Sequence, residues 1–189
     1  IEKIPEGAKY LGAGLDFGFS HVTAIVKLYQ YEDEDILDEY LFLAGMTAPR
    51  IADFIKSSSE LMSSVLVADS SRPEMIAVIK MLGCPVLSHK KRDVLSGVDL
   101  MHSKELYLTS SRENMIDEFR AYSYATDRTG KSLCVPDKKK DVDNSIDSAY
   151  TILTEKIKVE QTFPQCMPKP LLLDHLQTKA ELSMKIGNK

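Results

Sequence analysis

Three aspartates lie at positions where neither solvent exposure nor the solubility of a helix explains why the side chain is a carboxylate. Asp16 interrupts an apolar run between Leu15 and Phe17, and Asp69 ends the apolar run SVLVA. An ionised carboxylate in such a strand is costly to bury unless it is paired or binds a metal. Asp147 belongs to DVDNSIDSAY, which opens the last helical pattern of the chain. These positions therefore indicate a buried or half-buried acidic site.

Asp143 and Asp147 are four residues apart, so they share one helix face and repel each other. A cation in front of them would remove that repulsion. Mg²⁺ and Mn²⁺ are hard cations that favour oxygen ligands, and two such ions about 3.5–4 Å apart form a common catalytic pair. A single strand-end aspartate is more often a cap or turn former, and Asp143 alone could be favourable charge in a first helical turn. The joint pattern favours a divalent metal site.

The elements that must position these residues follow from hydrophobic periodicity. Strands are expected at 10–18, 22–31, 36–44, 64–70, 84–90 and 105–109, helices at 47–62, 72–82, 94–102, 111–119 and 141–158, and a hairpin at 121–136. The acidic run Glu32 to Asp35 is interpreted as a solvated turn. An opening three-stranded meander followed by strand–helix alternation predicts an α/β fold, a central mixed β-sheet flanked by helices with an added β-hairpin.

Length and composition fit this fold. The 189 residues are 43% hydrophobic, enough for one core, and we expect a domain at 1–160 with a C-terminal extension of unknown role at 161–189. The sequence begins without methionine, as a domain taken from a longer protein would. It has no apolar run of the roughly 20 residues that a membrane span needs. Its three cysteines form no CxxC pair, which favours a reducing cytosolic compartment over a zinc or disulfide site.

At these residues the sequence resembles the nuclease domain of tailed-bacteriophage terminase large subunits, the DNA-packaging motors. The resemblance extends from about residue 11 to residue 153. It rests on GLDFGFS, VADSSRPEMI, KKRDVLSGVDLMHSKELYLT, AYSYATDRTGKS and DNSIDSAY, which follow one another in the family's order.

The resemblance implies an RNase H-like fold and a metal-dependent endonuclease that cuts concatemeric double-stranded DNA by two-metal hydrolysis, leaving 5′-phosphate and 3′-hydroxyl ends. By position, Asp16, Asp69 and Asp147 would be catalytic metal ligands, with Asp143 as a further candidate, for Mg²⁺ or Mn²⁺. It also implies an ATPase domain, a small terminase subunit and the portal as partners, in the cytoplasm of the infected bacterial host. The sequence departs from the family at Asn144, where many relatives have a histidine.

The net charge of −4 does not by itself indicate nucleic-acid binding, but the basic residues occur in clusters. Contact with DNA phosphates is expected from the basic run after the strand at 84–90, from the hairpin tip and from the run before the last helix: Lys90, Lys91, Arg92, Arg128, Lys131, Lys138, Lys139 and Lys140. Solvated loops are the alternative for each cluster.

Other interpretations are weaker. ATDRTGKS satisfies a relaxed Walker A pattern, but SLCVP after it predicts a strand and not the helix that a phosphate loop requires. The four histidines, including His21 and His89, have no ligand-like spacing and are expected at the surface or in loops. Within the enzyme class the alternative is a Holliday-junction resolvase or another RNase H-like nuclease. Outside it, the alternative is a non-cleaving DNA-binding or docking module.

Overall fold

The fold is taken from a computed structural model, which describes residues 1–90, 100–101, 103–122, 124–129, 132–136 and 143–162. An antiparallel meander forms its centre: β1 (Lys9–Asp16), β2 (Val22–Tyr31) and β3 (Glu34–Ala44). All three strands are rich in apolar residues that alternate between the two faces of the sheet. The predicted meander is confirmed.

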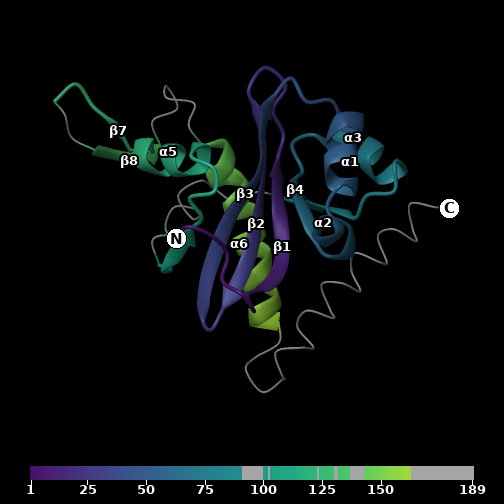
Figure 1. The fold of residues 1–189 in the computed structure, drawn as a ribbon. Helices are drawn as coiled ribbons and strands as arrows, with labels where there is room; N and C mark the ends of the chain where they lie inside the picture. Colours follow the sequence, from purple (N-terminus) through teal and green to yellow (C-terminus); the bar gives the residue numbers. More distant parts are fainter. Residues whose placement is uncertain (91–99, 102, 123, 130–131, 137–142, 163–189) are drawn as a thin grey trace.

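Three parallel pairings complete the sheet. β4 (Leu66–Asp69) pairs with β1, β5 (Val86–His89) pairs with β4, and β6 (Leu106–Leu108) pairs with β3 at the opposite edge. The strand order is β5-β4-β1-β2-β3-β6. The predicted α/β fold with a mixed sheet is therefore confirmed, and the strand that carries Asp16 lies next to the strand that carries Asp69 (Figure 1).

One face of the sheet is covered by α1 (Ala48–Lys56), α2 (Ser59–Ser63) and α3 (Pro73–Met81). Sequence periodicity predicts one helix over 47–62, but the structure has two. The break comes at Ser58, whose side chain accepts a hydrogen bond from the Leu61 amide and so begins a new helix.

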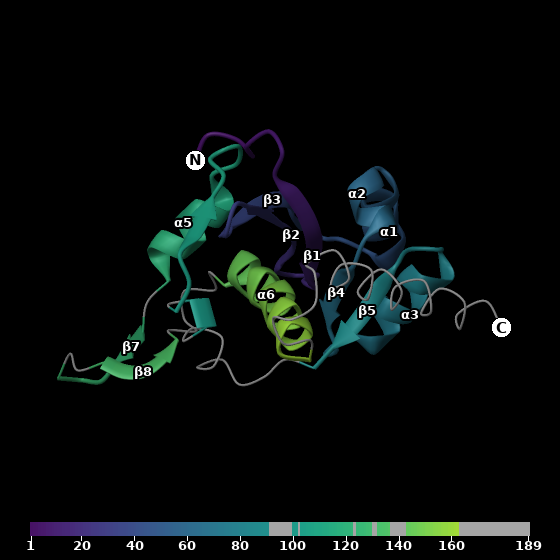
Figure 2. The same ribbon diagram turned by 90° about the horizontal axis from the view of Figure 1, so that it is seen from below.

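The opposite face is covered by α5 (Asn114–Ala121) and α6 (Asn144–Thr162). Seen along the sheet, α6 lies on one side of the central strands, and α1, α2 and α3 lie on the other (Figure 2). The apolar side chains buried between the sheet and this pair of helices include Leu11, Val26, Leu28, Leu37, Val65, Val67, Met115, Ala149, Ile152 and Leu153.

A separate hairpin of β7 (Tyr124–Thr126) and β8 (Ser132–Pro136) projects away from the sheet (Figure 1). The Walker-like segment therefore forms a hairpin and not a phosphate loop, as its sequence predicts. The helix expected at 94–102 falls outside the described residues except for its end, and the extension beyond Thr162 falls outside them entirely. Within the described ranges, no helix has the length and apolar character that crossing a bilayer requires.

Asp35 is not part of a solvated turn, and that prediction is wrong. Its carboxylate is buried, and both Lys104 and Lys156 donate to it. The turn is confined to Glu32 and Asp33, and Glu32 adopts the left-handed conformation there. Sequence alone assigns four consecutive acids to solvent, because the lysines that bury one of them come from distant parts of the chain.

Helix α6 lies directly against β1 because Gly14 has no side chain. A Cβ atom on Gly14 would overlap the carbonyl oxygen of Ser148, and one on Gly12 would be 3.0 Å from Cδ1 of Ile152. The Ser148 hydroxyl also accepts a hydrogen bond from the Val26 amide across 3.1 Å. Later helix residues thus contact earlier strand residues, so α6 runs antiparallel to β1 and its N-terminal end lies toward Asp16.

We predict that Gly14→Ala lowers the free energy of unfolding by about 3 kcal/mol, the cost of an overpacked core, because the new methyl group would push α6 off the sheet. Urea denaturation followed by circular dichroism measures this change. Lys9→Ala, at the exposed start of the same strand, is the control and should change stability by less than about 0.5 kcal/mol. Equal stability of the Gly14→Ala variant and the native chain would contradict the close contact.

Candidate functional site

Asp16 and Asp69 end two neighbouring parallel strands. Leu15 of β1 is in register with Ala68 of β4, and each aspartate is the next residue along its strand. Adjacent strands lie about 4.8 Å apart, so the two backbones adjoin at this edge of the sheet. Both aspartates are half-buried.

Both aspartates also belong to the face of the sheet that α6 covers. Alternate residues of a strand point to the same side, so Asp16 shares the side of Gly14, which contacts Ser148 of α6. Asp69 likewise shares the side of Val67, which is buried in the α6-side core. The register of the sheet thus places two carboxylates on the face that α6 covers.

Asp147 lies in the first turn of α6, one residue before the contact with β1. Asp143 directly precedes the helix, and its carbonyl accepts a hydrogen bond from the Asp147 amide across 2.7 Å. Because α6 runs antiparallel to β1, this end of the helix points toward the end of β1 at Asp16. The four predicted site residues are therefore brought to one corner of the domain by three separate elements.

These residues have the donor chemistry that a hard divalent cation prefers, since all offer carboxylate oxygens. Within the described part of the chain, however, no three carboxylate, imidazole or thiolate groups already converge to hold one ion. The corner therefore fits a cation by its backbone placement and its ligand type. Binding would draw the side chains together from their present positions.

The start of α6 is fixed by Glu118 of α5, a residue to which sequence analysis assigned no role. Its buried carboxylate accepts hydrogen bonds from the amides of Asn144 and Ser145, at 3.3 and 2.6 Å, and from the side chain of Asn144 at 3.0 Å. A carboxylate at a helix N-terminus satisfies free amides and complements the helix dipole. No sequence signal identifies this contact, because Glu118 lies 26 residues away from the helix that it caps.

A second buried carboxylate fixes the start of the preceding helix, α5, in the same way. Glu39 of β3 accepts hydrogen bonds from the Met115 amide at 2.7 Å and from the Asn114 side chain at 2.8 Å, at the start of α5. Glu39 of the sheet thus fixes the start of α5, and Glu118 of α5 fixes the start of α6. The position of Asp147 depends on both contacts.

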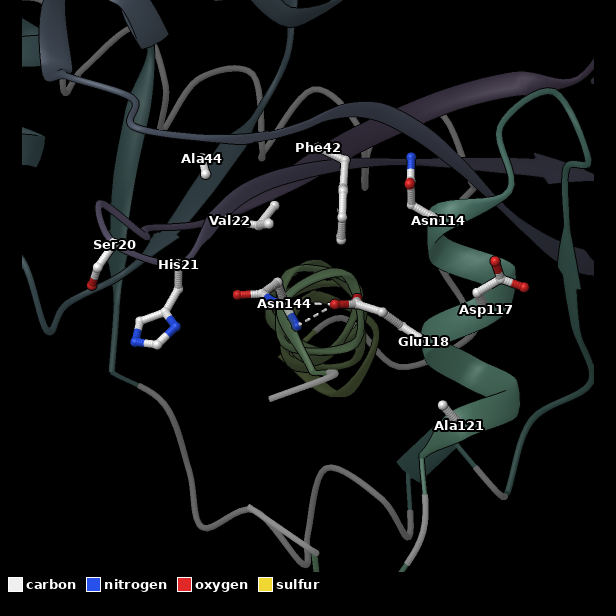
Figure 3. Close-up of a pocket in the computed structure, with 10 residues that line it drawn as sticks. All are labelled: Ser20, His21, Val22, Phe42, Ala44, Asn114, Asp117, Glu118, Ala121 and Asn144. Atoms are coloured by element: carbon white, nitrogen blue, oxygen red, sulfur yellow. Dashed lines mark hydrogen bonds between the residues drawn. The ribbon is translucent and has the colours of Figure 1, made fainter. Parts of the chain in front are cut away.

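A pocket of about 470 Å³ opens beside the start of α6 (Figure 3). Glu118 and Asn144 are hydrogen-bonded to each other in its wall, and His21 lines it from the loop after β1. Asn144 is buried and donates to Glu118, so its amide group serves the helix start. The lining residues are Ser20, His21, Val22, Phe42, Ala44, Asn114, Asp117, Glu118, Ala121 and Asn144.

Two of the predicted DNA-binding residues fall in the described part of the chain. Lys90 is exposed directly after β5, and Arg128 is exposed at the tip of the β7–β8 hairpin. The others, Lys91, Arg92, Lys131, Lys138, Lys139 and Lys140, lie outside the described residues. The prediction that His89 is a surface residue is wrong: it is 3% exposed and lies against α6.

Comparisons with known proteins find matches in fold but none in sequence. No protein-family model matches the chain, and no curated protein matches it in sequence. Solved structures do match. The large terminase nuclease domain of bacteriophage SPP1, with bound Mn, has a TM-score of 0.66 at 23% identity, over 76% of this chain and 85% of that one.

Two further terminase structures agree. The large terminase of the thermophilic bacteriophage D6E has a TM-score of 0.64 at 18% identity over 82% of this chain, which spans 42% of that protein. The large terminase nuclease of the thermophilic phage G20c, with bound cobalt, has a TM-score of 0.55 at 17% identity, over 79% of this chain and 84% of that one. The chain therefore has the RNase H-like fold of phage large terminase nuclease domains.

Proposed function

We propose that this chain is the endonuclease domain of a phage DNA-packaging terminase and cuts concatemeric double-stranded DNA with Mg²⁺ or Mn²⁺. The observation that supports the proposal is the backbone placement of three aspartates: Asp16 and Asp69 end two adjacent strands, and Asp147 lies in the first turn of the helix that packs on β1. The fold is that of the SPP1 and G20c nuclease domains, which were solved with bound Mn and cobalt.

The ligand chemistry of this corner suits a hard divalent cation. Asp16, Asp69, Asp143 and Asp147 are all carboxylates, and the first amides of α6 already donate to Glu118. The helix start is therefore not a phosphate site, although helix N-termini often are. A DNA phosphate would be repelled from this corner unless divalent cations came between them.

Asp16, Asp69 and Asp147 would hold the ions, with Asp143 as a further ligand. Bound divalent ions of this type lower the pKa of a coordinated water and neutralise charge on the scissile phosphate. Two of these ligands would stand on strands and one on a helix packed against them, so the backbone fixes where the ligands stand and their side chains would close on the ions. Asn144 keeps the first turn of α6 in place through Glu118, a positioning role that requires no proton transfer.

The wider setting follows from the same proposal. An ATPase domain, a small terminase subunit and the portal would be partners, and the domain would act in the cytoplasm of the infected host. The chain spans 42% of the D6E large terminase, which leaves room for a further domain in a full-length protein of that kind. Residues 161–189 would form an extension beyond the nuclease domain.

The first test removes the carboxylates one at a time. We predict that Asp16→Asn, Asp69→Asn and Asp147→Asn each reduce Mn²⁺-dependent plasmid cleavage at least about 100-fold, the scale expected when an electrostatic partner of the transition state is lost. In EDTA each variant should remain folded, because asparagine has nearly the same size and shape as aspartate. Gel assays and thermal denaturation measure the two effects.

Asp53→Asn is the matched control, since Asp53 is exposed on α1 on the opposite face of the sheet and should be dispensable. Plasmid cleavage by Asp69→Asn at the rate of the native chain would contradict the assignment of the site. Binding of DNA without any cleavage by the native chain would favour a docking module. Preference for a four-way junction over linear duplex would favour a resolvase.

The second test concerns the basic residues. We predict that Lys90→Ala and Arg128→Ala each weaken DNA binding and reduce the slope of log affinity against log salt by about 1, while kcat at saturating DNA stays within about twofold. Both side chains are exposed, Lys90 directly after β5 and Arg128 in the turn between β7 and β8. Fluorescence anisotropy between 50 and 200 mM salt measures the slope. Lys56→Ala, at the exposed end of α1, is the control, and an equal effect there would argue against a specific DNA path.

A further inference from the structure

His89 and Glu155 form a contact between the sheet and α6 that the proposed chemistry does not itself require. His89 ends β5, and its Nδ1 lies 3.3 Å from Oε2 of Glu155, two turns along α6 from Asp147. The His89 side chain is 2% exposed and that of Glu155 is 13% exposed. The contact therefore joins an edge strand to the helix in the interior of the domain.

His89 is also the direct neighbour of Asp69 in the sheet. Asp69 of β4 and His89 of β5 are in register, so they point to the same face, about one strand spacing apart. The His89 carbonyl accepts a hydrogen bond from the Ser70 amide across 2.9 Å, which fastens the chain immediately after Asp69. Asp69 is thus held against β5 both by its own pairing with His89 and by the hydrogen bond of the next residue, Ser70.

Stability alone is a weak reason for such a contact. A buried ionisable pair costs desolvation, and its replacement by well-packed apolar residues is often neutral or stabilising. The neighbouring Leu87 and Val67 belong to the apolar core on this face, so an apolar pair would be compatible with the surroundings. A directional hydrogen bond, unlike apolar packing, fixes the distance and the angle between two elements.

We propose that His89 and Glu155 form a clamp that positions Asp69 for the divalent metal. The inference rests on the proposed function of this corner. Asp16 and Asp147 are coupled by the direct contact of α6 with β1, whereas Asp69 stands on β4, one strand farther out. The clamp fastens that outer part of the sheet to the same helix. His89 acts through Asp69 and is a positioning residue, not a ligand.

The test measures Mn²⁺ affinity by titration calorimetry and plasmid cleavage in parallel on the whole chain. We expect His89→Leu and Glu155→Leu to bind Mn²⁺ about tenfold more weakly, the usual effect of losing a residue that orients a ligand. Their kcat should fall and their KM for DNA should not change. His89→Asn places an amide nitrogen near the position of Nδ1, and Glu155→Gln keeps an acceptor, so both should remain within about threefold of the native affinity.

Lys156→Met is the matched control. It breaks the neighbouring buried contact of α6 with Asp35 of β3, which lies toward the opposite edge of the sheet from Asp69. It should lower the melting temperature and leave Mn²⁺ affinity unchanged, which separates the clamp from a general loosening of α6.

Native Mn²⁺ affinity and cleavage in a folded His89→Leu variant would overturn the clamp. So would an asparagine variant that is as weak as the leucine variant. If the native chain binds Mn²⁺ but cuts no DNA, the proposed function fails and the clamp is still decided by the affinities. If the native chain binds no Mn²⁺, both fail.

Discussion

The contact between Gly14 and Ser148 is the constraint on which the rest of the domain depends. A helix backbone touches a strand backbone there, and there is no space for a single methyl group between them. This close approach determines how far α6 lies from the sheet and brings its first turn over the end of β1. Asp16 and Asp147 come from positions 131 residues apart in sequence, and this contact is what places them at one corner.

Buried carboxylates then determine where α6 begins. Glu39 holds the start of α5, and Glu118 of α5 holds the start of α6. Both use their carboxylates on the backbone amides that begin a helix, so their role is to position α5 and α6. The first amides of α6 are satisfied by Glu118 and so are not available to bind a phosphate.

Much of this could be predicted from the sequence. The positions of Asp16 and Asp69 at the ends of strands follow from local apolar patterns and are confirmed, whereas their role as ligands stays a prediction. The meander and the strand–helix alternation predict the mixed sheet for the same reason. The burial of Asp35 and His89 and the cap formed by Glu118 could not be predicted, because each depends on a partner far away in sequence. Local composition assigns such polar residues to solvent, and only the tertiary fold supplies the partner that permits their burial.

The measurement that tests the central claim most directly is anomalous diffraction from a crystal of the chain soaked in Mn²⁺. The account predicts a manganese peak at the corner, with carboxylate oxygens of Asp16, Asp69 and Asp147 at about 2.0–2.3 Å from the ion or ion pair. The three carboxylates should converge on that ion more closely than the structure places them. A peak elsewhere on the domain, or none at a manganese concentration that supports DNA cleavage, would contradict it.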